Sequence, residues 1–120
     1  MNNQEFGKLM EIRTRKFAVN IVKLSSVLLI SKENDVIKNQ ITKSGTSVAA
    51  NYREANRARS KADFYNKIKI CESETNETIF WLEVISELKL SFTDELESIL
   101  KEANELLAIF TSIDIKLKCS

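Results

Sequence analysis

The chain contains no proline and only two glycines, Gly7 and Gly45, among its 120 residues. These two residue types supply the turn conformations that β-hairpins need, and average proteins contain roughly 5% proline and 7% glycine. An all-β fold with many tight turns is therefore strongly disfavoured. Long helices joined by short polar segments are the natural alternative, and residues 1–120 fit one domain of ordinary size.

Apolar residues recurring at helical spacing predict four helices, near residues 8–31, 35–56, 61–89 and 94–117. The expected N-caps are Asn34 or Asp35 for the second helix, Ser60 for the third and Thr93 for the fourth. Joints of about four to five residues make neighbouring helices antiparallel. We therefore expect an all-α, up-down-up-down four-helix bundle. The small residues around Gly45 predict a close approach of another helix, because a mid-helix glycine costs ~1 kcal/mol relative to alanine.

The third predicted helix carries two apolar seams. The first comprises Phe64, Ile68, Cys71, Thr75, Thr78, Leu82 and Ile85. The second, about 100° around the helix, comprises Ile70, Glu74, Glu77, Trp81, Val84 and Leu88. Because one bundle cannot easily bury both, the apolar members of the second seam are predicted to form an interface with a further helix or a neighbouring subunit.

Histidine is absent, which removes the commonest general acid-base group and metal ligand. The two cysteines, Cys71 and Cys119, show no metal-ligand spacing, and no glycine-rich phosphate loop is present. We therefore expect no enzymatic activity, no cofactor and no small-molecule substrate. The polar N-terminus does not resemble a signal peptide, and no apolar run approaches the ~18 residues of a membrane span, so we expect a cytoplasmic protein.

Several glutamates on the second and third predicted helices invite comparison with carboxylate-bridged metal sites in helical bundles. Without histidine, the interpretation favoured is that Glu74 and Glu77 are buried or half-buried and hydrogen-bonded by Thr46, Ser47 and Asn51. The rival enzyme hypothesis is a carboxylate-only metal site, with Glu54, Glu74 and Glu77 as its ligands.

Charge is unevenly distributed along the chain. Residues 1–61 carry twelve Lys and Arg against five acids, a net +7, whereas residues 62–120 carry six Lys against twelve acids, a net −6. This asymmetry favours head-to-tail contacts between copies, since a basic side can then meet an acidic side. The start of the first helix and the end of the second must lie at one end of an antiparallel bundle. Six cations there predict a nucleic-acid surface: Arg13, Arg15, Lys16, Arg53, Arg57 and Arg59.

Two alternatives remain open for these six cations. They can cap helix ends with solvated side chains, or they can pair with acids of a neighbouring subunit in a purely structural or protein-binding scaffold. Steep salt dependence of RNA or DNA affinity distinguishes phosphate binding from both.

The run Ile41–Ala55, with its small residues closing on Asn51-x-x-Glu54, resembles the central motif of the proteins encoded in intervening sequences of bacterial 23S ribosomal RNA genes. Ser60–Phe64 and Ser73–Leu82 resemble that family's next two motifs. Accessory variability proteins of diversity-generating retroelements, which bind a reverse transcriptase and nucleic acid, are related to it. The resemblance implies a bacterial, cytoplasmic, homopentameric four-helix bundle. Ser47, Asn51, Glu54 and Glu74 match family polar positions, interpreted as structural contacts between helices.

Overall fold

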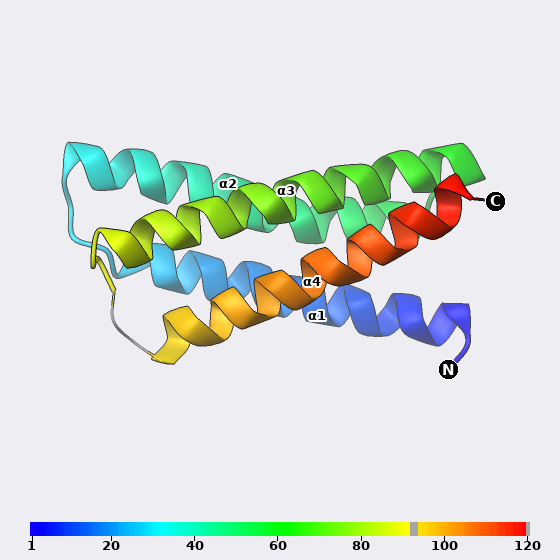
Figure 1. The fold of residues 1–120 in the computed structure, drawn as a ribbon, viewed down its shortest axis with the longest axis horizontal. Coiled ribbons are helices and arrows are strands. Elements are labelled where there is room, and N and C mark those ends of the chain that lie inside the picture. Colours follow the sequence, from blue (N-terminus) through cyan, green and yellow to red (C-terminus); the bar gives the residue numbers. More distant parts are fainter. Residues whose placement is uncertain (92–93, 120) are drawn as a thin grey trace.

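The computed structural model describes residues 1–91 and 94–119, which form four helices. They are α1 (Asn3–Ser26), α2 (Lys32–Ala55), α3 (Lys61–Glu87) and α4 (Asp94–Lys118). The helices run alternately up and down along a molecule of 46 × 25 × 21 Å (Figure 1). The predicted all-α four-helix bundle is confirmed. None of the described helices is long and apolar enough to cross a membrane.

Side-chain caps fix where three of the helices begin. The Asn2 side chain accepts a hydrogen bond from the backbone N–H of Glu5 at 2.8 Å. Because of this cap, α1 begins at Asn3, whereas its apolar pattern predicts a start near residue 8. Ser60 accepts the N–H of Asp63 at 3.0 Å and caps α3, as predicted. The predicted cap Thr93 lies outside the described residues.

The N-cap of α2 differs from the prediction. Ser31, in extended backbone conformation, accepts the N–H of Asn34 at 3.0 Å, so the expected caps at Asn34 and Asp35 are wrong. Asn34 lies inside the first turn, and its buried side chain donates from Nδ2 to the carbonyl oxygen of Leu29 at 2.8 Å. The predicted caps are thus one turn too late, because the cap precedes a polar first turn of Lys32 and Glu33.

All four helices contribute to one hydrophobic core, whose largest fully buried side chains include Phe17, Ile21, Tyr52, Ile68, Leu82 and Phe110. Gly45 gives α1 and α2 their close approach. A Cβ at this position would lie 2.8 Å from Cγ2 of Ile21, so the packing reason expected for this glycine is present.

The α2–α3 interface is closed and contains buried hydroxyl groups. Thr78 Oγ1 and Ser44 Oγ lie at hydrogen-bond distance, 2.9 Å apart, and both residues are fully buried. The Cys71 thiol lies 3.7 Å from the carbonyl oxygen of Val48. Burial raises the pKa of this thiol to about 12, so it remains protonated.

The α1–α4 edge is open by comparison. Among the described neighbouring helices, α1 and α4 contact each other least. In the view of Figure 1, α4 crosses α1 obliquely, and its C-terminal end diverges from the N-terminal end of α1. A groove of about 900 Å³ lies there, and its lining includes Phe6, Tyr52, Phe64 and Ile113. α1 is therefore less covered by α4 than by α2.

Candidate nucleic-acid interface

Arg13, the first of the predicted nucleic-acid ligands, ties α1 to α4. Its Nε and Nη2 donate to the two carboxylate oxygens of Glu102 at 2.7 and 2.6 Å. Nη2 also lies 3.3 Å from Glu105 Oε1. Hydrogen bonding to Glu102 is the main cause that raises the pKa of Arg13. This guanidinium is neutralised within the chain, which removes most of its attraction for a phosphate.

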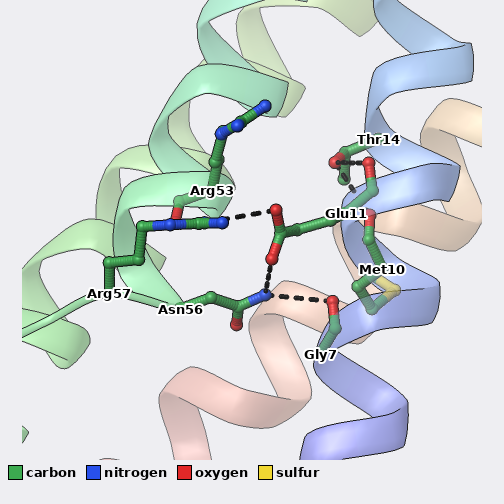
Figure 2. Close-up of polar contacts among 7 residues, drawn as sticks. All are labelled: Gly7, Met10, Glu11, Thr14, Arg53, Asn56 and Arg57. Atoms are coloured by element: carbon green, nitrogen blue, oxygen red, sulfur yellow. Dashed lines mark hydrogen bonds and ion pairs between the residues drawn. The ribbon is translucent and has the colours of Figure 1, made fainter.

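Arg57 is paired as well, at the junction between α1 and α2 (Figure 2). Its Nη1 lies 3.2 Å from Glu11 Oε1. Asn56 Nδ2 donates to Glu11 Oε2 at 2.8 Å and to the carbonyl oxygen of Gly7 at 3.0 Å. These contacts confirm that the start of α1 and the end of α2 meet. The Asn56 hydrogen bond, followed by Arg57, lowers the pKa of Glu11 and keeps it charged.

Arg53 and Arg59 lie near this junction without joining a single patch. Arg53, one turn before Arg57, is exposed and contributes weakly to the low pKa of Glu11 (Figure 2). Arg59 is exposed in the segment between α2 and α3, and its backbone N–H donates to Asp63 Oδ2 at 3.3 Å. The six predicted cations are therefore divided among several environments.

Arg15 and Lys16 have the most favourable setting for an anion. Together with Lys23 they line a shallow hollow of about 280 Å³ on α1, whose other walls are Val19 and Asn20. No acid lines this hollow, and all three cations are exposed. Lys16 and Lys23 also line adjoining hollows that contain acids of α4, Glu102 and Glu105 beside Lys16 and Asp94 and Glu95 beside Lys23.

Positive charge extends along the exposed side of α1 toward its N-terminus, where Lys8 is exposed. We call Lys8, Arg15, Lys16 and Lys23 the cationic face of α1. Lys8 and Arg15 are seven residues apart, as are Lys16 and Lys23, so each pair recurs after two helical turns. At 1.5 Å per residue, the face extends over about 22 Å. This heptad spacing was visible in the sequence, but the prediction omitted Lys8 and Lys23.

The four residues predicted as polar contacts between helices behave differently from one another. Asn51 Nδ2 donates to Oγ and to the carbonyl oxygen of Ser47, each at 2.9 Å, so this contact stays within α2. Glu54 Oε1 meets Lys67 Nζ of α3 at 3.6 Å. Glu74 is half-buried, and its backbone carbonyl accepts the hydroxyl of Thr78. Of the four, only Glu54 has a described side-chain ion pair to another helix.

Glu77 is exposed, so the expectation that it is at least half-buried is wrong. Within residues 1–91 and 94–119, no group of three or more Cys, Asp and Glu side chains is placed to hold a metal ion. Glu54, Glu74 and Glu77 accordingly do not form the ligand set that the rival hypothesis requires.

The second seam of α3 lies at the surface, as the two-seam pattern predicts. Ile70 and Leu88 are 40% and 57% exposed, and Trp81 and Val84 are half-buried. Phe80, beside this seam, is 54% exposed and packs edge-on against Trp81 with ring centroids 5.0 Å apart. We call Ile70, Phe80, Trp81, Val84 and Leu88 the outer face of α3.

A carboxyl pair between α3 and α4 was not predicted. Thr111 Oγ1 donates to Glu72 Oε2 at 2.7 Å, and Asp114, one turn further along α4, is buried. Burial, followed by Asp114, raises the pKa of Glu72, whereas hydrogen bonding to Glu72 is the main cause that lowers the pKa of Asp114. Asp114 lies four residues after Phe110 and three residues before Leu117, on the apolar stripe of α4. This position was the sequence signal that could have indicated a buried acid.

The fold and these surfaces define a class: a four-helix bundle with one open edge and a cationic first helix. The family model of the 23S rRNA-intervening sequence protein matches residues 11–112, and the chain belongs to that family. No curated protein matches. One similar solved structure is a crystal structure of a protein of unknown function from the S23 ribosomal protein family of Bacteroides thetaiotaomicron. It is 37% identical, with a TM-score of 0.81, and the match covers 90% of this chain and 96% of that chain.

Proposed function

We propose that the protein is a non-enzymatic, self-assembling, cytoplasmic bundle that binds the phosphate backbone of nucleic acid along the cationic face of α1. The observation that carries this proposal is the hollow lined by Arg15, Lys16 and Lys23 without any acid. Phosphates placed there gain attraction to three cations, and releasing the counter-ions condensed on nucleic acid adds to the affinity. Arg13 and Arg57 have no direct part, because carboxylates already neutralise them.

Apolar side chains between the cations support a nucleotide polymer over a free anion. Ile12 and Val19 are exposed beside Lys8, Arg15 and Lys16 on α1. A polymer can place successive phosphates on the cations and its sugars or bases against these side chains. The family's description makes RNA the first polymer to test. Readout of base edges is not needed, so we expect little sequence preference.

The test is a fluorescence anisotropy titration of labelled single-stranded RNA and DNA at low salt. We expect Arg15→Glu/Lys16→Glu to weaken binding at least tenfold. The matched control is Lys43→Glu/Lys116→Glu, which makes the same charge change at two exposed positions, one on α2 and one on α4. Equal weakening by both double variants would show that only net charge matters. Absence of any complex with the native protein would remove the nucleic-acid proposal and leave the structural or protein-binding scaffold.

Self-assembly is supported by a separate observation, the exposure of the outer face of α3. Exposed apolar residues gathered on one helix face are typical of interfaces. The excess of positive charge in α1 and α2 and of negative charge in α3 and α4 favours contact between unlike sides. Five copies is the number implied by the resemblance to intervening-sequence proteins. Light scattering of the 13.7 kDa chain measures the mass directly, and a concentration-independent monomer would sink this part of the proposal.

A further inference from the structure

The short segment between α1 and α2 contains three strongly exposed apolar side chains. Val27, Leu29 and Ile30 are 73%, 81% and 89% exposed, whereas Leu28 between them is only 4% exposed and belongs to the core. We call residues 27–31 the α1–α2 linker. Runs of exposed apolar residues lower solubility and are expected only where they have a use.

The backbone of the α1–α2 linker is held in place by hydrogen bonds. The backbone N–H of Leu28 donates to the carbonyl oxygen of Ser25 at 3.3 Å, and buried Asn34 donates to the carbonyl oxygen of Leu29 at 2.8 Å. Ser31 caps α2 immediately afterwards. The apolar side chains of Leu29 and Ile30 are therefore presented to solvent from a fixed backbone. Fixing a contact residue in advance reduces the entropy lost on binding.

The residues on either side of the α1–α2 linker are basic, and acids of two elements lie close by: Glu33 and Asp35 in α2, and Asp94 and Glu95, which share a hollow with Lys23 and Val27. No Asp or Glu occurs from residue 12 to residue 32, and Lys23 and Lys32 stand on either side of the linker. Leu29, Ile30 and Lys32 are exposed and suit a surface that is apolar and carries acids.

The outer face of α3 has the required character. Phe80 and Leu88 are 54% and 57% exposed, and exposed Glu77, Glu83 and Glu87 surround them. No Lys or Arg occurs from residue 70 to residue 88. The two surfaces are both apolar, and the acids of the α3 surface can pair with exposed Lys32 beside the linker.

Both surfaces lie at the same end of the bundle, where α1 and α3 end and α2 begins (Figure 1). In a ring of parallel bundles, the linker of one copy is therefore level with the end of α3 of the next. We propose that the α1–α2 linker of each copy packs against the C-terminal half of the outer face of α3 in its neighbour, a contact that rests on the self-assembly proposed above. Because unlike surfaces meet, each copy uses both, and the contacts can close into a ring.

Two double variants and their mixture test this contact. Leu29→Ser/Ile30→Ser removes the linker surface, and Phe80→Ser/Leu88→Ser removes the α3 surface. All four side chains are more than half exposed, so the monomer should keep its fold, which circular dichroism and thermal unfolding check. Val22→Ser/Ile115→Ser is the matched control, with two exposed apolar side chains elsewhere.

We expect the native protein and the control to be oligomeric by light scattering, and each double variant to be monomeric. An equimolar mixture of the two double variants should give a dimer, since one intact contact remains between them. A native oligomer whose mass survives Leu29→Ser/Ile30→Ser would overturn the linker contact alone. A mixture that stays monomeric would also overturn it, whereas a monomeric native protein would overturn self-assembly as a whole.

Discussion

The α2–α3 interface and the α1–α4 edge join neighbouring antiparallel helices by different means. Between α2 and α3, hydroxyl and thiol groups are fully buried, as Ser44, Thr78 and Cys71 show. Between α1 and α4, the described ion pairs are the partly exposed contacts of Arg13 with Glu102 and Glu105, and grooves open along the edge. The difference indicates that the α1–α4 edge contributes less to stability than the α2–α3 interface, and it leaves cations of α1 accessible.

The largest expected effect concerns apolar packing on the two sides. Leu82→Ala on α3 removes a fully buried side chain and should cost about 2–5 kcal/mol of unfolding free energy. Ile109→Ala on α4 removes a half-buried side chain beside the large groove and should cost about 1–2 kcal/mol. Urea unfolding measures both. Equal losses would show that the α1–α4 edge is packed as well as the α2–α3 interface.

A smaller effect is expected from the ion pair at the open edge. Arg13→Met should lower the unfolding free energy by about 1 kcal/mol, because the pair is bidentate but the side chains of Arg13 and Glu102 remain 35% and 28% exposed. Hydrogen exchange should accelerate in α4 more than in α2 and α3. Arg15→Met is the control, with no described acid partner. Faster exchange throughout the bundle would mean that this pair stabilises the whole fold equally.

The smallest effect is the pH dependence contributed by Glu72. Because folding raises its pKa, this group stabilises the fold below its unfolded pKa of about 4.3, and that contribution is lost as pH rises through the folded value. Asp114, whose pKa is lowered, acts in the opposite sense and loses its contribution as pH falls. Glu72→Gln should therefore gain stability relative to the native chain as pH rises above about 4.3. Urea midpoints across this range measure the difference, and parallel pH profiles would exclude the coupling.

Sequence patterns predicted the bundle because helix formation depends on local spacing and on the lack of turn residues. Ser60 was identified as a cap because Asp63, three residues on, completes a capping box. Ser31 was missed because the first turn of α2 after it is polar. Ser31 is followed three residues on by Asn34, so it shows no capping box with an acid.

The candidate site was predicted only in part because ion pairing depends on distant elements. Glu102 lies 89 residues from Arg13 in sequence, and its reach to that guanidinium depends on how α4 crosses α1. No count of charges per half of the chain distinguishes Arg13, which is paired, from Arg15, which is not. The exposed heptad spacing of Lys16 and Lys23 was the more informative signal.

The measurement that tests the proposed site most directly compares unpaired and paired cations in the same RNA titration. The magnitude of the slope of log affinity against log salt concentration should decrease by about 0.7–0.9 in Arg15→Ala, because one phosphate contact contributes that amount. Arg57→Ala, which loses a cation already paired with Glu11, should leave the slope nearly unchanged. The reverse result, or an equal loss in both variants, would contradict binding at the cationic face of α1.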